Sequence, residues 1–340
     1  MDTAVRKELS EGDAALLHES LRRFVRTTPV TVGVCVITYK RPKGLHRCLQ
    51  SLQLLQFRLS STPHISIFVV DNDPSASAQP IVQQLQTLSK WPITYDVEPT
   101  RGISYARNRA VSLAKDCDFI AFIDDDEYAD PFWLDELLET QRLHNADVVA
   151  GSVIPEFDEG VPDWIKRAWP NGRRRGKVRT GSQVGFAITG NCLFRANVLR
   201  DIPEPFEPRL ALTGGSDRFL GLRLSRQGHK IVWCNESVVH EIVPPSRSNI
   251  GWMLRRAYRT GNDGVLCEKL LPREIRKSPV LRGVRAVIRI PIEASQLLAA
   301  LLKRRRAEAT KHLLNIAQAW GTITGLLGIR YEEYRRIHGS

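Results

Sequence analysis

The sequence predicts an α/β fold with a mostly parallel central sheet flanked by helices, followed by a helical C-terminal region. Two observations support this prediction. Apolar runs of strand length alternate with helical patterns between residues 30 and 138, and such an alternation is typical of a parallel sheet covered on both faces. Polar side chains also follow three of these runs directly, and open α/β sheets bind their ligands at that edge.

The first strands and helices have clear patterns. VTVGVCVIT (residues 30–38) is almost continuously apolar and rich in β-branched residues, as expected for a strand buried on both faces. Apolar residues at helical spacing predict a helix over residues 43–55. HISIFVVDND (residues 64–73) predicts a second buried strand, and residues 79–90 have a helical pattern.

The next three elements repeat the alternation. ITYDVEP (residues 93–99) predicts a short strand, and residues 102–116 begin with a glycine and continue as an amphipathic helix. FIAFIDDDE (residues 119–127) predicts a buried strand that ends in four consecutive carboxylates. Three of the four strands predicted in this half, over residues 30–38, 64–73 and 119–127, therefore end in polar residues.

Residues 151–250 are less regular. The alternation in residues 176–194 predicts a pair of strands, and residues 217–227 predict a helix that Gly228 closes before another strand. A preceding loop contains two tryptophans and an arginine run, for which contact with acceptor sugars or lipid phosphate and a plain surface loop are both open. These residues are Trp164, Trp169 and Arg173–Arg175.

We divide the chain into three parts. Residues 1–28 alternate charged and apolar residues without a signal-peptide core, which predicts a short amphipathic helix and a cytoplasmic protein. Residues 29–250 form the α/β domain, with its halves at 29–150 and 151–250. Residues 251–340 form a basic helical region. The six scattered cysteines have no CxxC pair and indicate buried free thiols in a reducing compartment.

Most of the positive charge lies in the last part. The chain has a formal net charge of +12, and from Gly251 to Ser340 there are 18 Lys or Arg against 7 Asp or Glu. A local excess of this kind favours an anionic partner, either lipid or nucleic acid. The basic region lacks interleaved aromatic residues and a recognisable recognition module, so we expect no nucleic-acid partner.

An apolar stretch within the basic region favours a membrane surface. Residues 290–302 are too short to span a bilayer and are flanked by basic residues. Such a segment can lie at the interface of an anionic membrane. The alternative is a basic helix packed on the protein's own surface. The flanking residues are Arg282, Arg285, Arg289 and Lys303–Arg306.

The four consecutive carboxylates Asp124–Glu127 are candidates for a functional site. Adjacent like charges repel, and their desolvation is costly unless a positive group is nearby. A solvated loop is one explanation. The other is a divalent cation, because Mg²⁺ or Mn²⁺ binds to one or two carboxylates while the phosphates of a substrate complete its coordination.

Four motifs in this order resemble family 2 glycosyltransferases with the GT-A fold. The segments VCVITYKRPKGLHRCLQSL, IFVVDND, RGISYARNRAV and FIDDDE are similar to the nucleotide-sugar half of that family. TGGSDRFLGLRLSRQGHKIVWCNESVVHEIVPPSR resembles its acceptor half, and GLLGIRYEEY is similar to the branch that builds bacterial exopolysaccharides of the succinoglycan type.

The resemblance implies roles for individual residues. Donor binding would involve Thr38, Tyr39, Arg41, Asp71, Asn72, Arg107, Asp124 and Asp125. A Mg²⁺ or Mn²⁺ ion would be held by Asp126, Asp124 and His240, and Asp217 would be the catalytic base. For Arg107 an exposed helix residue, and for His240 a packed strand histidine, remain the alternatives.

One position departs from the family pattern. The family usually has a glutamate before the base aspartate, and Ser216 stands there in this chain. The chain therefore lacks the glutamate that contacts the acceptor in the family, while the aspartate that would be the base is retained. A serine at this place would also be a good N-cap for the following helix.

The resemblance implies an inverting transferase. It would move a sugar from a nucleoside diphosphate to a hydroxyl of a lipid-linked oligosaccharide, as a peripheral enzyme on the inner face of the plasma membrane. A metal-dependent nucleotidyltransferase is the alternative, since it would also use clustered carboxylates. An aspartate-nucleophile phosphatase requires DxDx[TV], which DDDEY does not supply.

Overall fold

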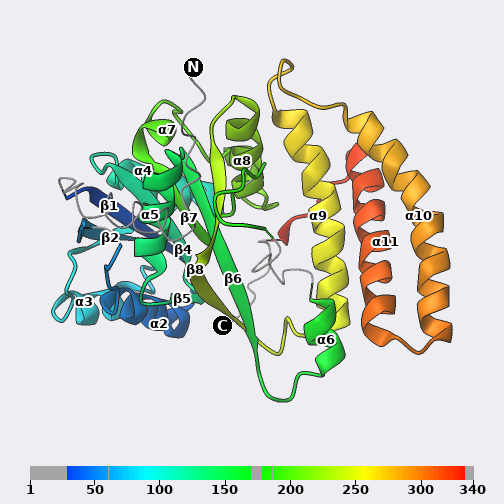
Figure 1. Ribbon diagram of the computed structural model, residues 1–340, viewed down its shortest axis with the longest axis horizontal. Coiled ribbons are helices and arrows are strands. Elements are labelled where there is room, and N and C mark those ends of the chain that lie inside the picture. The colour runs from blue at the N-terminus through cyan, green and yellow to red at the C-terminus, as the bar shows by residue number, and fades with distance from the viewer. Residues whose placement is uncertain (1–28, 60, 170–177, 186, 334–340) are drawn as a thin grey trace, which may run out of the picture.

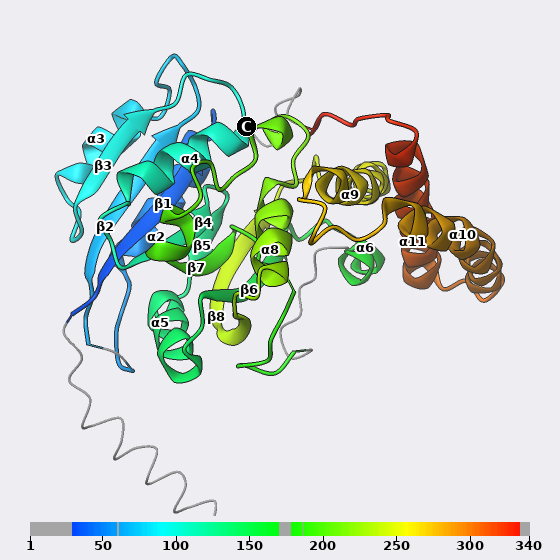
Figure 2. The same cartoon turned by 90° about the horizontal axis from the view of Figure 1, so that it is seen from above.

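The computed structural model describes residues 29–59, 61–169, 178–185 and 187–333. They form an α/β body with a layer of three long helices beside it, as Figures 1 and 2 show. The predicted helix over residues 1–28 and the run Arg173–Arg175 lie outside the described residues. The predicted α/β class and the helical C-terminal region are confirmed.

The body contains one eight-stranded sheet. Its order is β3 (Ile93–Val97), β2 (His64–Asp71), β1 (Thr31–Thr38), β4 (Phe119–Asp124), β7 (Asn191–Arg195), β6 (Val148–Phe157), β8 (Ile231–Val243) and β5 (Glu127–Ala129). The first four strands are parallel. β7 is antiparallel to both of its neighbours, β6 and β8 are parallel, and β5 is antiparallel to β8. The order reverses between β1 and β4, which places the ligand crevice outside their carboxyl ends.

Helices cover both faces of the sheet, as the alternation predicts. One hydrophobic core packs α2 (Pro42–Gln53), α3 (Gln79–Gln86) and α5 (Trp133–His144) against the sheet. The other face carries α4 (Ile103–Leu113), α7 (Ala196–Arg200) and α8 (Ser216–Arg226). A large aromatic side chain is fully buried under the helices of each face, Trp133 on the first face and Phe206 on the second.

The predicted strand pair over residues 176–194 is wrong. Among the described residues of this stretch, only the start of β7 is a strand, and an isolated bridge joins Gln183 to Val232. β6 pairs along nearly the whole length of β8 and so occupies one edge of that strand. The described residues before β7 instead form a loop that hydrogen-bonds to the start of β8, as from the Val184 amide to the Ile231 carbonyl oxygen at 2.9 Å.

The C-terminal layer consists of α9 (Ile250–Leu270), α10 (Pro279–Leu302) and α11 (Arg306–Leu326). α9 and α11 cross with their backbones in contact. A Cβ atom on Gly261 would lie 1.9 Å from the Gln318 carbonyl oxygen, and one on Gly321 would lie 1.9 Å from the Tyr258 carbonyl oxygen. Only glycine permits so close an approach at these two positions.

α10 has an exposed apolar stripe on its outer side. Its members are Val280, Leu281, Val284, Val287, Ile288, Ile292, Leu298, Leu301 and Leu302, each at least half exposed. The spacing of these residues follows one face of a helix. Within the described ranges, no helix has the length and apolar character needed to cross a membrane.

The chain returns toward the body after α11. Asn262 in α9 anchors this return, because its side chain donates to the Ile329 carbonyl oxygen at 2.8 Å and accepts from the Tyr331 amide at 3.3 Å. The Tyr331 ring packs edge-on against Tyr258. The chain after α11 thus runs back toward the α/β body (Figure 2), and Glu333 lines a cavity together with side chains of that body.

Candidate active site

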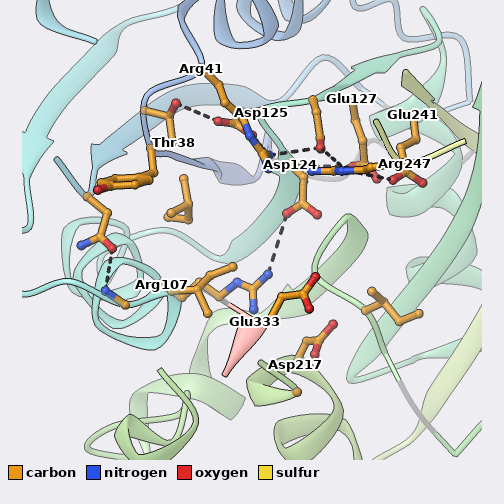
Figure 3. A pocket seen from close by; sticks show the side chains of 18 of the residues that line it. Thr38, Arg41, Arg107, Asp124, Asp125, Glu127, Asp217, Glu241, Arg247 and Glu333 are labelled. Carbon is orange, nitrogen blue, oxygen red and sulfur yellow. Dashed lines mark hydrogen bonds and ion pairs between the residues drawn. The ribbon is translucent and has the colours of Figure 1, made fainter. Parts of the chain in front are cut away.

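A cavity of about 210 Å³ lies outside the carboxyl ends of β1 and β4 (Figure 3). Side chains from both halves of the α/β domain and from α9 line it. From the predicted set it contains Thr38, Tyr39, Arg41, Asn72, Arg107, Asp124, Asp125, Asp126 and Asp217. The predicted rim of polar strand ends therefore forms one concave site.

The four consecutive carboxylates form a tight turn at the cavity. Asp124 ends β4 and Glu127 begins β5, and a Glu127 carboxylate oxygen accepts from the Asp124 amide at 3.1 Å. A Cβ on Gly44 would lie 2.6 Å from the Asp125 carbonyl oxygen, and one on Gly190 would lie 2.6 Å from the Glu127 carboxylate. Glycines on both sides thus allow the turn to pack closely.

Arginines from distant segments neutralise two of these carboxylates. Asp125 accepts from the Thr38 hydroxyl at 2.8 Å and from Arg41 at 3.0 Å. Asp126 accepts from Arg41 at 3.1 Å and from Arg247 at 3.0 Å. Although burial raises the pKa of Asp126, the Arg41 and Arg247 guanidiniums hold it below its usual value.

Asp124 is less well neutralised than its neighbours. Its carboxylate is 3.8 Å from the Arg107 guanidinium, and 42% of its side chain is open to solvent within the cavity. Burial among protein atoms raises the pKa of Asp124 to about 6, against the opposing effect of Arg107. Repulsion from Asp126, Asp125 and Asp217 adds to the shift. Asp124 is therefore the carboxylate of the turn that most needs a cation.

Arg107 connects the two halves of the site and is not an exposed helix residue. It is buried in α4, and its guanidinium donates to the Ser216 hydroxyl at 3.0 Å. The predicted N-cap role of Ser216 is wrong, because α8 begins after Gly215 and Ser216 is already helical. Ser216 instead ties Arg107 to the start of α8.

Asp217 points into the cavity from the first turn of α8. Gly214 and Gly215 precede the helix with φ of 88° and 85°, a left-handed conformation that glycine adopts readily. Figure 3 shows the carboxylates of Asp217 and Glu333 across the cavity from Asp125. The predicted base and the predicted donor site therefore face the same space.

Of the two predicted residues at the end of β2, Asn72 lines the cavity and Asp71 does not. Asp71 is fully buried, lies outside the cavity lining, and accepts from the Ala78 amide at 2.8 Å and the Tyr95 hydroxyl at 3.0 Å. It therefore orders the loop after β2. Asn72 lines the cavity and accepts from the Gly102 amide at 2.8 Å, which fixes the start of α4.

The structure does not bring His240 to the cavity. Its ring stacks on Tyr128 with centroids 4.8 Å apart, and its Nε2 lies 3.0 Å from an Asp130 carboxylate oxygen. Successive residues of a strand point to opposite sides. The neighbouring Glu241 therefore lines the cavity, where Arg247 lies 3.7 Å away.

Several lining residues were not predicted from the sequence. They are Glu241, Arg247, Trp252, Arg256, Arg259 and Glu333. The Arg259 guanidinium is 3.3 Å from the Glu333 carboxylate and 3.5 Å from Asp263. A signal existed for two of them, because Arg256 and Arg259 are three residues apart and share one helical face.

The predicted acceptor loop is partly a packed element. Trp169 follows α6 (Asp163–Ala168), is 6% exposed, and stacks on Trp252 of α9 with centroids 5.1 Å apart. Trp252 lines the cavity. Trp169 therefore supports the cavity wall from behind and is not an exposed loop residue.

The donor set suits a hard divalent cation that a substrate helps to hold. In the described part of the chain, no group of three or more His, Cys, Asp or Glu side chains could hold a metal by itself. Mg²⁺ commonly binds through one or two carboxylates plus substrate phosphates. Asp124 and Asp126 provide two carboxylates at the cavity wall.

Comparison with known proteins identifies the family. Residues 33–203 match the profile of Glycosyl transferase family 2. The chain belongs to this family. It is 30% identical over 324 residues to the succinoglycan biosynthesis protein ExoM of Rhizobium meliloti, covering 91% of this chain and 96% of that protein. The resemblance that the motifs indicated is therefore confirmed.

Two further comparisons concern a second curated relative and a solved structure. The glucosyl-dolichyl phosphate glucuronosyltransferase of Haloferax volcanii is 24% identical over 196 residues, 52% of this chain and 58% of that protein. The mannosyltransferase PcManGT from Pyrobaculum calidifontis, solved in complex with GDP-Man and Mn²⁺, superimposes with a TM-score of 0.59 at 17% identity, covering 91% of this chain and 94% of that one. This family 2 glycosyltransferase thus has the GT-A fold.

Proposed function

We propose that this glycosyltransferase moves a sugar, with inversion, from a nucleoside diphosphate sugar to a hydroxyl of a lipid-linked saccharide in exopolysaccharide synthesis. The observation that carries the proposal is the position of Asp217, which faces the arginine-neutralised carboxylate turn across one cavity. The names of the relatives in Rhizobium meliloti and Haloferax volcanii support the pathway and the lipid-linked acceptor.

The donor would occupy the side of the cavity formed by β1 and α4. Tyr39 offers a ring for the base, with the Lys40 ammonium 5.4 Å and the Arg101 guanidinium 5.8 Å from its centroid. Asn72 lines the cavity beside it. Arg107, buried between Asp124 and Ser216, would face the donor phosphates. Asp71 would act indirectly, by holding the loop that carries Asn72.

Asp217 would be the base. The acceptor oxygen attacks the anomeric carbon as the bond to the diphosphate oxygen breaks, and the acceptor proton passes to the Asp217 carboxylate. A single displacement of this kind inverts the configuration. Asp217 lies in the first turn of α8, where the helix dipole stabilises negative charge.

A Mg²⁺ or Mn²⁺ ion would be held by Asp124 and Asp126. Such an ion would neutralise the charge that develops on the leaving diphosphate. Asp124 has the raised pKa and the open face that fit this role. Asp126 is shared with Arg41 and Arg247, so those guanidiniums would turn toward the diphosphate when the cation binds.

A peripheral position on the inner face of the plasma membrane would bring the enzyme to a lipid-linked acceptor. The exposed apolar stripe of α10 supports this part of the proposal, since side chains such as Val287, Ile288 and Leu302 are 57%, 57% and 77% exposed. A helix with such a face can lie within the headgroup region.

A screen of purified protein against nucleotide sugars tests the proposal. We expect donor hydrolysis with one class of donor in Mn²⁺ or Mg²⁺, its loss in EDTA, and its return when the ion is added back. Full activity in EDTA would contradict the metal assignment. A product in which the nucleotide remains joined to the sugar phosphate would instead favour the nucleotidyltransferase alternative.

A further inference from the structure

A second cavity lies where α8 meets the C-terminal layer. Its volume is about 230 Å³, and side chains of α8, α9, α10 and α11 line it. Four of its lining residues are arginines, namely Arg218, Arg282, Arg285 and Arg289. Within the described part of the chain, its lining contains no acidic residue.

The neighbouring acids neutralise this cluster only in part. Glu268 is 3.6 Å from Arg282, but it also forms a bidentate ion pair with Arg226, with hydrogen bonds of 2.7 and 2.6 Å. Glu293 pairs with Arg289 at 3.0 Å and also accepts from His312 and Asn315. Burial, together with repulsion from Arg218, lowers the pKa of Arg282. The cavity therefore holds more positive charge than its surroundings balance.

The backbone of α9 makes room for these guanidiniums. A Cβ on Gly264 would lie 2.3 Å from an Arg282 nitrogen and 3.1 Å from an Arg218 nitrogen. Arg218 is further fixed by donating to the Thr260 carbonyl oxygen at 2.9 Å. Two cations are thus held together over a glycine, an arrangement in which an anion bound between them would relieve their repulsion.

The position of the cavity connects it with both the active site and the apolar stripe. Arg218 follows Asp217 directly, and Thr260 follows Arg259, so each pair has one member in each cavity. On the outer side, Val284, Val287 and Ile288 alternate along α10 with the cavity arginines. The arginine cavity therefore lies between the proposed base and the surface that would meet lipid.

We propose that this four-arginine cavity binds the diphosphate group of the lipid-linked acceptor, an inference that rests on the proposed function. Arginine forms paired, charge-assisted hydrogen bonds with phosphoryl oxygens. A diphosphate held there would direct its saccharide toward Asp217 and its lipid chain toward the exposed face of α10. The ion pairs of Glu268 and Glu293 would keep the arginines in place before the ligand arrives.

Calorimetric titration with inorganic pyrophosphate in EDTA tests the site. We expect wild-type protein to bind, and the R285Q/R289Q variant to bind about ten- to a hundredfold more weakly, since a hydrogen bond to a charged group is worth about 1.5–3 kcal/mol. R273Q, which removes the same charge at an exposed residue outside the cavity, should bind like wild type. If the double variant does not fold, R285Q alone provides the test, because Arg285 is exposed.

Pyrophosphate binding that is equal in wild type and the variant, or absent in both, would overturn the proposal. Competition separates the possible sources of the phosphoryl group. Neutral phosphatidylcholine vesicles with a polyprenyl diphosphate should displace pyrophosphate, and vesicles with phosphatidylglycerol at equal charge should not. Equal displacement by both would assign the cavity to phospholipid headgroups. Donor hydrolysis by the wild type, measured without acceptor, reports on the proposed function separately.

Discussion

Two charged clusters of this protein are neutralised to different extents. At the acidic turn, Asp125 and Asp126 are paired with Arg41 and Arg247, which come from the two ends of the α/β domain. In the arginine cavity, Arg282 pairs with Glu268 and Arg289 with Glu293, but both acids have other partners as well, and Arg218 shares the nearby Asp263 with Arg259. Asp125 and Asp126 are thus balanced by arginines within the protein, while the arginine cavity has an excess of one sign.

The difference indicates what each cluster requires from outside. A balanced site can exchange partners when a ligand arrives, as Arg41 and Arg247 would do if a cation took over Asp126. An unbalanced site has a stronger need for a counter-ion, and it gains stability when one binds. The predictions below alter one side of this comparison at a time.

The largest effect is expected at Asp217, which lies between the clusters. D217N should lower the transfer rate roughly 10²–10⁴-fold, because the amide cannot take the acceptor proton. Donor affinity and melting temperature should stay near those of wild type. D116N, at an exposed position, is the matched control. A fall in melting temperature with unchanged turnover of the folded enzyme would make Asp217 a structural residue.

The next largest effect is expected where α9 and α11 touch, at the floor of the arginine cavity. G261A should destabilise the protein by about 1–3 kcal/mol, because the added methyl group meets the Gln318 carbonyl oxygen, which cannot move aside. Thermal unfolding measures this loss. G160A should have little effect, since a Cβ there would meet no atom within 4 Å. Equal melting temperatures for G261A and wild type would show that α9 and α11 can move apart without loss of stability.

A smaller effect concerns the pH dependence of the acidic turn. The pKa of Asp124 is about 6 in the folded protein against an ordinary 3.8, so the folded state binds the proton more tightly. The stability that this proton provides is present below pH 4 and is lost as the pH rises through 6. D124N should remove this loss, and its metal-free melting temperature should exceed that of wild type more at pH 7 than at pH 4. A constant difference would contradict the assignment.

The smallest effect is expected on the apolar stripe. L298S/L301S should weaken flotation with anionic vesicles by about tenfold, since each leucine would bury only part of its side chain in the interface. L88S provides the control, because Leu88 is 79% exposed on the α/β body. Wild-type binding that is equal for neutral and anionic vesicles, or absent for both, would count against a basic membrane-surface helix.

Local patterns predicted much of this architecture. The strands β1, β2 and β4 are buried on both faces, so their sequences are almost continuously apolar and easily recognised. The polar residues that follow them were correctly placed at one rim, as Thr38 and Asp125 show by their hydrogen bond. The start of α8 was also predicted to within one residue.

The sequence could not predict contacts that arise from packing between distant segments. Nothing near Arg247 shows that it meets Asp126, which lies 121 residues earlier. The choice between His240 and Glu241 depends on which face of β8 meets the cavity, and a one-residue error exchanges the two. Arg107 resembles an exposed helix residue until α8 is folded against it and Ser216 accepts its hydrogen bond.

The return of the chain that places Glu333 in the cavity has a consequence for biosynthesis. Ribosomes add roughly 5–20 residues per second, so about 10–40 s pass between the synthesis of Asp126 and that of Glu333. During this interval the parallel strands can already pair. The nascent protein still lacks Asp217 and Arg247 at first, and later it still lacks the cavity wall that Arg259 and Glu333 form. We expect partly made chains to be unable to consume nucleotide sugars, so catalysis begins only after Glu333 has been synthesised and has reached the cavity.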